Sequence, residues 1–511
     1  MTVNYHMHPY NRKNFLRQLL LAALGSAFFP KLLSGHSLDL TAAGEPVFSP
    51  PEGNYVPNEF AIVDLHCHPS LKMYLFGRKL WRRHTPGLGI NAIDLQDDMA
   101  QLTSGSIPDQ DGKGLVKGMV VAHYLPEVGI EQWDTLKKIY PKIARVFKKF
   151  TGKIEHGDAS NITQVLLMIT ELNSQVDKAN KKKGFELFKV VQHYDDFSAA
   201  IKNKQFPIAH AIEGAHALGR DRSAPVNRIR PHNPYAEKMK IVGHDKVPDY
   251  IENLKTLKSN GVCMMTLAHF FSNDIAYPVE GISPDEKKTI GMRWKYTNTP
   301  KDNRQLTTVG ETVVNWMLDN GMIIDLTHST PAIRDQVFNI NARKKCQRPI
   351  VFTHTGSQEV FTEHDEGKFF NFAYYCVSPE DVTHICGCDG TIGVIPEVFW
   401  LAGGDTHLRR QGLSPAKFRN GIPYMVETIQ CINSMTPTKD YRHISIGTDF
   451  DGFADVPQDL YEATQLDALI EALRYALTEE LKDSNAADEA VKRITSENAC
   501  RVLQNGWKKD C

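Results

Sequence analysis

Histidines and carboxylates follow several short apolar runs of this sequence. His66 and His68 come after the run that begins at Ala61, and they are two positions apart. Side chains two apart on a strand point to the same face, so this pair can bind one metal ion together. Other apolar runs are followed by Glu213, His269, His328, His354 and Asp449. A two-metal hydrolytic site needs imidazole ligands, a carboxylate that two ions can share, and an acid that can carry a proton.

Each of these residues alone has an ordinary explanation. A histidine at the end of a strand is usually a hydrogen-bonded polar residue, and Asp449 has the surroundings of a turn aspartate. Their joint occurrence after successive apolar runs favours the metal site.

The runs themselves predict the elements that position these side chains. Eight runs alternate with longer helical patterns beyond about residue 45, over residues 61–65, 118–122, 207–212, 262–267, 322–326, 350–353, 391–395 and 443–447. This alternation is typical of βαβ units and a parallel sheet. We therefore predict an α/β fold, a (β/α)8 TIM barrel of the metal-dependent hydrolase type, whose ligand residues converge at the carboxyl ends of the strands. The alternative is an open doubly wound sheet, but no Gly-x-Gly-x-x-Gly fingerprint follows the first run.

Two of the expected helices have clear boundaries. The pattern over residues 307–320 keeps Val313 and Met317 on one face, and Gly321 follows as a stop. Ser378 and Pro379 have the residue types of the N-cap and first position of another helix.

The 511 residues of the chain would suit two or three domains, but α/β barrels with insertions often form one large domain, so length alone does not decide the domain count. We expect a single (β/α)8 domain over residues 46–511, with a Lys-rich helical insertion at 124–206 and a loop insertion at 219–246. The formal net charge of -1 provides neither a basic surface for nucleic acid nor a polybasic patch for membranes. The nine cysteines include no C-x-x-C pair, so we predict no disulfide framework. A small-molecule substrate is the expected partner, and a homodimer is possible.

The segment 1–45 has the composition of an export signal and linker. A basic stretch at residues 12–17 precedes an apolar run at 19–29, which is too short to span a bilayer. The order Arg-Lys-x-Phe-Leu-Arg resembles a twin-arginine signal in which lysine replaces the second arginine. We therefore predict export, to the periplasm. The alternatives are an N-terminal membrane anchor and a surface helix.

Six ordered motifs make a family resemblance specific. They resemble those of the membrane (renal) dipeptidase family, which belongs to the amidohydrolase superfamily. The resemblance extends over roughly residues 60–505, and residues 496–503 resemble the terminal helix motif of that family. The six motifs lie at residues 64–69, 212–218, 266–269, 321–328, 352–355 and 447–452.

The resemblance implies a role for each site residue. It implies a site for two divalent ions, expected to be zinc, with Glu213 bridging both. His66 would belong to one ion and His328 and His354 to the other, and Asp449 would complete the site beside the water. Asp449 would also take the proton of the attacking water and pass it to the leaving amine. The resemblance assigns His269 to holding the substrate and polarising its carbonyl.

The sequence departs from the family pattern at two places. His68 stands where the family has an aspartate ligand, which removes one negative charge from the site. A site with a His-x-His pair still provides a complete ligand set for two ions, and we expect His68 to be a ligand. After the motif of His354 the family also has an arginine, and this arginine binds the free carboxylate of the peptide. No arginine occurs between Arg348 and Arg409, so His364 and Lys368 are the cationic candidates for that role.

These observations predict a dipeptidase-like metallohydrolase. The expected reaction is hydrolysis of the amide bond of small substrates, with dipeptides as the leading class, by a water that bridges two divalent ions. One alternative is another amidohydrolase reaction, such as N-acyl amino acid deacylation or lactone opening. A catalytically silent metal-binding barrel is the other, although Glu213 and Asp449 together argue against it because a binding protein needs no proton carrier.

Overall fold

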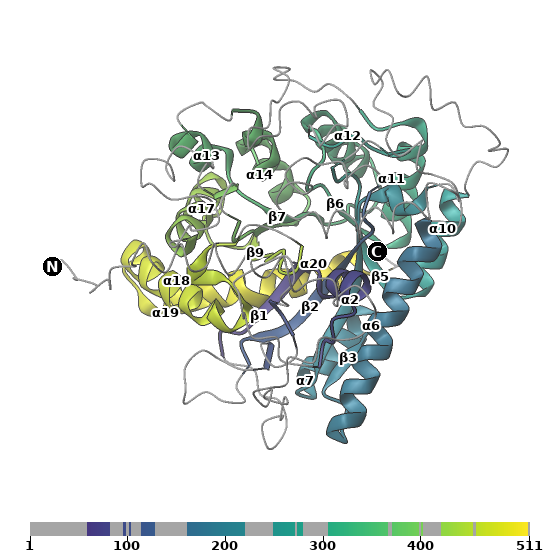
Figure 1. Cartoon of the computed structure of the whole chain (residues 1–511). Helices are drawn as coiled ribbons and strands as arrows, with labels where there is room; N and C mark the ends of the chain where they lie inside the picture. Colours follow the sequence, from purple (N-terminus) through teal and green to yellow (C-terminus); the bar gives the residue numbers. More distant parts are fainter. Residues whose placement is uncertain are drawn as a thin grey trace, which may run out of the picture.

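Parallel strands surrounded by helices form the body of the molecule (Figure 1). The computed structural model describes residues 59–81, 96–98, 102–103, 114–127, 161–219, 249–270, 273–279, 305–365, 370–397, 400–401, 421–452 and 456–508. The signal-like segment, the linker and the second predicted insertion at 219–246 lie almost entirely outside these residues.

The described residues form a nine-stranded parallel sheet in the order β1-β2-β4-β5-β6-β7-β8-β9, with β3 paired to the start of β4. All eight predicted strands are present at their predicted places, and the fold is the predicted (β/α)8 barrel. Only the short β3 was not predicted. The strands are β1 Ile62–Cys67, β2 Val116–Tyr124, β3 Phe188–Val190, β4 Phe206–Glu213, β5 Val262–Thr266, β6 Ile323–Asp325, β7 Ile350–Thr355, β8 Thr391–Val394 and β9 Ile444–Ile446.

The barrel closes between its first and last strands, at their carboxyl ends. The backbone N–H of His68 donates to the carbonyl of Phe450 over 2.6 Å, and that of Asp449 donates to the carbonyl of His66 over 2.8 Å. Closure therefore ties the backbone around Asp449 to that of His66 and His68, which lie far from it in the sequence.

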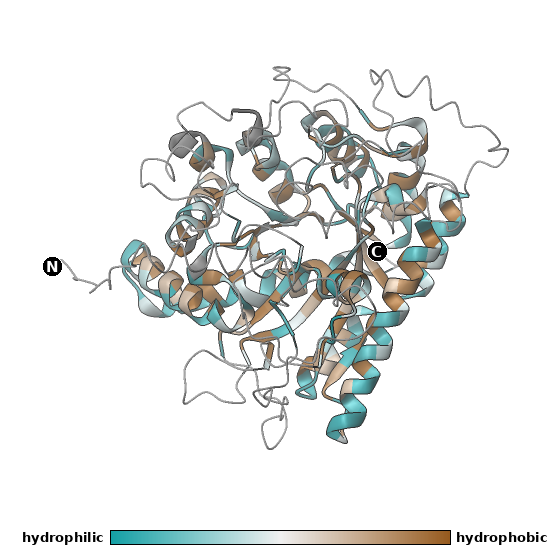
Figure 2. Cartoon of the chain, viewed as in Figure 1, coloured by the Kyte–Doolittle hydropathy of each residue, from teal (hydrophilic) through white to brown (hydrophobic). Residues whose placement is uncertain are grey.

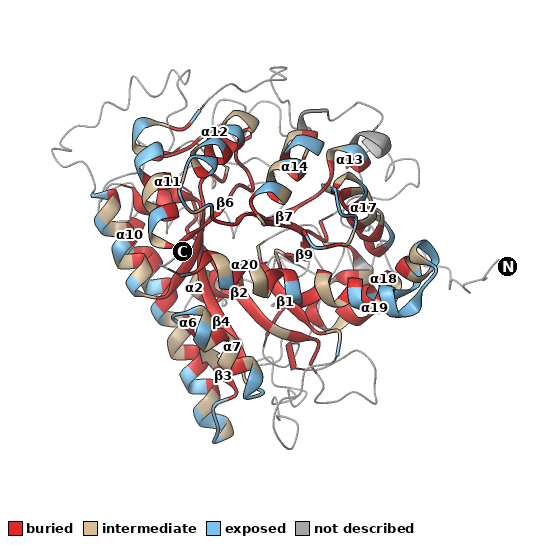
Figure 3. Ribbon diagram, turned by 180° about the vertical axis from the view of Figure 1, so that it is seen from behind, coloured by how far each residue is buried: buried red, intermediate tan, exposed pale blue. Residues whose placement is uncertain are grey.

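Helices cover the outside of the strands. Their inner faces are buried and apolar, whereas their outer faces are polar and exposed (Figures 2 and 3). The α-helices are α2 Pro69–Phe76, α6 Asn161–Lys183, α7 Tyr194–Lys202, α10 Tyr250–Ser259, α11 Thr308–Asn320, α12 Pro331–Ala342, α13 Gln358–Asp365, α14 Pro379–Gly387, α17 Gly421–Met435, α18 Leu466–Leu481, α19 Ser484–Lys492 and α20 Asn498–Gly506. Shorter helical turns are η4 Ala215–Leu218, η6 Phe370–Tyr375, η8 Gln458–Leu460, η9 Ala463–Gln465 and η10 Arg493–Glu497.

The predicted helix boundaries are confirmed by their capping contacts. Thr307 caps α11 by accepting a hydrogen bond from the N–H of Gly310, and Gly321 ends it with φ of 64°. Ser378 and Asp381 form a reciprocal capping box at the start of α14, with Pro379 as its first residue.

The terminal helix α20 covers the amino-terminal end of the barrel. Ala499, Val502 and Leu503 pack in one core cluster with strand residues such as Val63 and Ala209. The side-chain amide of Asn498 donates to the carbonyls of Tyr441 and Ile444, where β9 begins, over 2.7 Å each. The end of the barrel that carries the strands' carboxyl termini is therefore the end left for the site.

The described residues include part of the first predicted insertion, most of the cysteines and the helices that could be tested for a membrane span. The first predicted insertion contains α6, with three lysines in its last turn, as well as β3 and α7. Seven cysteines of the described residues form no disulfide bond, whereas Cys346 is disulfide-bonded, which the sequence patterns did not predict. Among the helices of the described residues, none is long and apolar enough to cross a membrane.

Candidate metal centre

The predicted ligand residues meet at the carboxyl ends of six strands. Within the strands, His66 lies near the end of β1, Glu213 ends β4, and His354 lies near the end of β7. His68, His269, His328 and Asp449 lie in the segments that follow β1, β5, β6 and β9. All seven are buried except Asp449, whose side chain is 14% exposed. The parallel topology thus brings together residues that are up to 383 positions apart in the chain.

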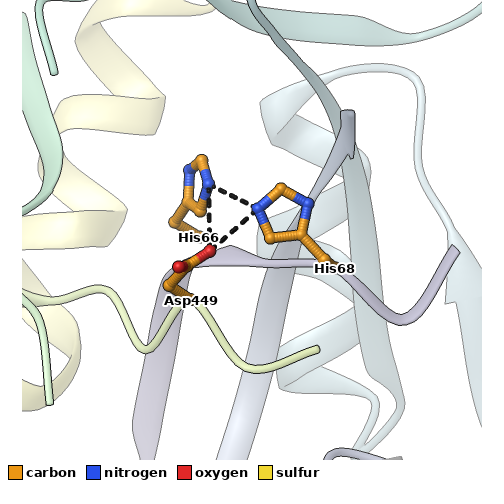
Figure 4. Close-up of side chains that lie close together, drawn as sticks. All are labelled: His66, His68 and Asp449. Carbon is orange, nitrogen blue, oxygen red and sulfur yellow. Dashed lines mark hydrogen bonds and ion pairs between the residues drawn. The ribbon is translucent and has the colours of Figure 1, made fainter. Parts of the chain in front are cut away.

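Two histidines and one carboxylate form the first half of the site (Figure 4). The Nε2 atoms of His66 and His68 lie 2.9 Å apart. Oδ1 of Asp449 lies 2.9 Å from Nε2 of His68 and 3.9 Å from Nε2 of His66. Three ligand atoms therefore face one another in a space that suits a single cation.

Glu213 connects this half of the site to a second histidine pair. The Nε2 atoms of His328 and His354 lie 3.1 Å apart, and each is 3.5 Å from Oε1 of Glu213. The same carboxylate lies 3.3 Å from Nε2 of His66 and 3.3 Å from Nε2 of His68. Glu213 is thus shared by both histidine pairs, as a bridging carboxylate must be.

The hydrogen bonds of Thr353 fix which ring nitrogens face the site. Its hydroxyl donates to Oδ2 of Asp325 over 2.7 Å. The hydroxyl oxygen can then only accept from Nδ1 of His66, at 2.9 Å, and from Nδ1 of His354, at 3.0 Å. In their neutral forms both rings therefore carry a lone pair on Nε2, which is the form that binds a metal ion. The residues present fit a divalent cation.

The backbone around Asp449 is held in an uncommon conformation. Asp449 and Asp451 have φ of 51° and 68°, in the left-handed region that side chains other than glycine rarely occupy. The carboxylate of Asp451 is bound by Nζ of Lys72 over 2.7 Å, and both side chains are fully buried. Asp64 accepts from the N–H and the hydroxyl of Thr448, over 3.0 Å and 2.6 Å. Buried contacts on either side thus hold Asp449 in place.

Burial and charge shift the ionisation of the site residues. Burial acts to raise the pKa of Glu213, but His269 and His68 outweigh it and hold that pKa well below its usual range. Burial acts to lower the pKa of His68, but Glu213 and Asp449 raise it to about 9. Burial, reinforced by His66, lowers the pKa of His354 well below its usual value. The site therefore holds an ionised carboxylate among imidazoles of differing basicity.

His269 lies beside these ligands and is bound to a residue that the sequence patterns did not single out. Its Nε2 lies 3.6 Å from Oε2 of Glu213, while its Nδ1 lies 2.9 Å from Oε2 of Glu127. Glu127 is three positions past the end of β2. The signal that identified the other site residues, a ligand-type side chain at or just after the end of a strand, could also have identified this one.

Aromatic side chains line the second half of the site. The ring of Trp400 stacks on His354 with a centroid distance of 5.5 Å. Tyr375 and Phe270 lie edge-on to His328, at 5.9 Å and 5.7 Å. The side chains of His364 and Lys368, which we predicted to contact substrate, lie outside the described residues.

The comparisons with known proteins agree with this architecture. Residues 222–508 match the model of the membrane dipeptidase family, peptidase family M19. An uncharacterized dipeptidase of Schizosaccharomyces pombe is 27% identical over 245 residues, which cover 48% of this chain and 49% of that protein. The dipeptidase aclJ of Aspergillus oryzae is 26% identical over 246 residues, or 48% of this chain and 45% of that protein. The chain spans about half the length of these curated relatives.

Solved structures share the fold. A metallopeptidase of Rhodobacter sphaeroides, solved with a phosphinate mimic of the dipeptide L-Ala-D-Ala, superimposes with a TM-score of 0.55 at 15% identity, over 89% of this chain and all of the other. The probable dipeptidase PvdM of Pseudomonas aeruginosa has a TM-score of 0.52 at 15% identity, over 88% of this chain and 97% of the other.

Proposed function

The chain belongs to the membrane dipeptidase family, peptidase family M19, and from this we propose that it hydrolyses the amide bond of small substrates, with dipeptides as the leading class. The observation that carries the proposal is the position of Glu213, whose carboxylate lies within 3.5 Å of the Nε2 atoms of two separate histidine pairs. A carboxylate placed in this way is suited to bridge two ions.

The proposed ligand sets follow from these distances. His66, His68, Glu213 and Asp449 would hold one ion, and Glu213, His328 and His354 would hold the other. Imidazoles with carboxylates are ligands that zinc accepts readily, so we propose two zinc ions. When bound, two such ions would polarise the scissile carbonyl and lower the pKa of the attacking water.

The remaining chemistry belongs to side chains of the protein. Among the carboxylates of the site that the structure describes, Asp449 is the one that is partly exposed, so it can accept a proton from water and return it to the leaving amine. His269 presents Nε2 beside Glu213 and is proposed to bind the carbonyl oxygen of the substrate. Separate residues would thus handle the proton and the developing negative charge.

A second candidate substrate class is N-acyl amino acids. The observation that favours it is the aromatic lining of Phe270, Tyr375 and Trp400 against His328 and His354. An acyl chain would bury apolar surface against these rings, whereas the amino group of a dipeptide would gain little there.

A substrate panel tests the proposal. Purified protein would be assayed with dipeptides and N-acyl amino acids, before and after treatment with a chelator and again after zinc is restored. We expect hydrolysis that chelation abolishes and zinc recovers. Metal-loaded protein that hydrolyses neither class would contradict the proposed function, and a preference for N-acyl amino acids would favour the second candidate.

We also propose that the protein is exported to the periplasm. The basic stretch at 12–17 and the apolar run at 19–29 support export, as does the disulfide bond of Cys346, since disulfides persist mainly in oxidising compartments. Cell fractionation followed by N-terminal sequencing tests the proposal. A chain that stays in the cytosol with its N-terminus intact would contradict it.

A further inference from the structure

Glu127 is a buried carboxylate that contacts His269 through the nitrogen facing away from the metal ligands. Its side chain is 1% exposed, and its Oε2 lies 2.9 Å from Nδ1 of His269. We propose that Glu127 is the positioning residue of His269, which holds the imidazole so that Nε2 faces the substrate and Glu213. This inference rests on the proposed function, in which His269 binds the substrate carbonyl.

The geometry of the contact restrains the ring. Oε2 of Glu127 accepts from Nδ1–H of His269 and also from the backbone N–H of Phe270, over 3.2 Å. One oxygen thus binds both the ring and the adjoining backbone, which limits rotation of the ring about its bond to Cβ. Tyr124 packs against the same ring with a centroid distance of 4.4 Å. With Nδ1 occupied in this way, Nε2 is left 3.6 Å from Oε2 of Glu213.

Three further elements fix Glu127 itself. Nε2–H of His216, in η4, donates to the carbonyl of Leu125 over 2.7 Å, which anchors the segment between β2 and Glu127. The side-chain amide of Asn161, at the start of α6, donates to the carbonyl of His216 over 2.6 Å. The backbone N–H of Glu127 donates to the hydroxyl of Tyr124 over 3.4 Å. The carboxylate therefore sits on a supported loop, as a positioning residue requires.

The metal ligands are held by a different set of contacts. Thr353 binds His66 and His354 through their Nδ1 atoms, and Asp64 holds the segment of Asp449 through Thr448. Removing the Glu127 carboxylate should therefore disturb His269 and leave both ions bound. This separation makes the role of Glu127 measurable.

A double-mutant cycle tests the inference in the metal-loaded enzyme. We expect Glu127→Ala to lower kcat/KM about 100-fold, since a small misplacement of a catalytic group costs about that much, with zinc content unchanged. Adding Glu127→Ala to His269→Ala should cost less than about twofold, because the positioned ring is already absent. Glu127→Gln should recover at least part of the loss, since its amide oxygen can still accept from Nδ1–H. Losses that multiply in the double variant, or loss of zinc from Glu127→Ala, would overturn the inference.

Asp381→Asn serves as the control for removal of a buried carboxylate. Asp381 is paired with Arg334 over 2.8 Å, on α14 and α12. Asp381→Asn should change activity by the same factor in the wild type and in the His269→Ala variant.

A measurement without substrate separates this inference from the proposed function. In protein labelled with 15N-histidine, the Nδ1–H resonance of His269 should be visible by NMR because it is hydrogen-bonded and buried, and His269→Ala identifies it. We expect Glu127→Ala to abolish or shift this resonance. A wild-type protein that hydrolyses no substrate would refute the proposed function alone, whereas an unchanged resonance in Glu127→Ala would refute the role of Glu127.

Discussion

The hydroxyl of Thr353 donates to Oδ2 of Asp325 over 2.7 Å. Asp325 also accepts from the hydroxyls of Thr266 and Thr327, over 2.6 Å each, so its carboxylate is fixed by neighbouring strand ends. Because the Thr353 proton is committed to Asp325, its oxygen remains as an acceptor for the Nδ1–H groups of His66 and His354. This relay of hydrogen bonds lets Asp325, which is not a proposed ligand, set the tautomers of His66 and His354 through Thr353.

Thr353→Val should weaken metal binding without removing any ligand. Valine has nearly the same shape as threonine but offers no acceptor, so the two rings lose the bond that sets their tautomers. We expect metal affinity to fall about 10–100-fold, measured by competition with a chromogenic chelator. Thr391→Val is the matched control, because Thr391 is equally buried in a strand and bonds Ser445 over 2.8 Å. Equal affinity in the Thr353 variant and the wild type would contradict the relay.

Glu213→Gln should remove both metal and activity. The substitution keeps the shape of the side chain but removes the negative charge shared by the two histidine pairs. We expect elemental analysis of purified protein to show close to two ions per wild-type chain and fewer in the variant, with turnover lost in parallel. Glu479→Gln changes an exposed glutamate and should alter neither quantity. A variant that kept two ions and full turnover would rule out the bridging role.

Metal binding should release a proton from His68. In the metal-free site its pKa is raised to about 9, so the ring is protonated at neutral pH and an ion must displace that proton. Below pH 9 this proton should therefore lower the apparent metal affinity about tenfold for each unit by which the pH falls. Above pH 9 its contribution to the pH dependence should vanish. Calorimetry in buffers of different ionisation enthalpy measures the proton count at pH 7. His68→Asn, whose side chain does not titrate, should remove this proton from the count, and an identical count in both proteins would contradict the assignment.

Lys72→Met should destabilise the fold strongly. It leaves the fully buried carboxylate of Asp451 without its cationic partner, and removing one member of a buried pair costs about 3–5 kcal/mol. Lys344→Met is the control, because Lys344 pairs with Asp319 at the surface, where the side chains are 20% and 58% exposed. That substitution should cost at most about 1 kcal/mol. Urea unfolding at a fixed metal concentration compares the two, and similar free energies of unfolding would contradict the structural role of Lys72.

Substrates with a free C-terminal carboxylate should be preferred over their amides. The family arginine is absent, but Lys368 and His364 follow the same motif and supply positive charge. We expect kcat/KM for a dipeptide to exceed that for its C-terminal amide by about two orders of magnitude, the lower end of the range for truncating a buried charge pair. Lys368→Ala should raise KM for the free acid and leave the amide nearly unaffected. Equal kcat/KM values for acid and amide in the wild type would show that nothing replaces the arginine.

Local sequence patterns were sufficient to predict the barrel and the ligand-type residues at the carboxyl ends of its strands. Apolar runs predict strands because burial on both faces demands continuous hydrophobic side chains, and parallel connection places every carboxyl end on one side. Seven ligand-type residues could therefore be assigned to one rim before their distances were known. The end of one helix at Gly321 and the start of another at Ser378 could also be predicted from the local sequence, because capping involves neighbours in the chain. Strand β3 was missed because a pairing of three residues leaves no periodic signal.

Only the tertiary structure decided how those residues are oriented. The tautomers of His66 and His354 depend on Thr353 and Asp325, which reach them from β7 and β6. His269 is set by Glu127, which lies 142 positions away in the chain. Hydrogen bonds of this kind form between strand ends that are adjacent only after the barrel closes, and no spacing in the sequence records them. The sequence therefore specifies which side chains meet, and the closed barrel specifies which of their atoms face the substrate.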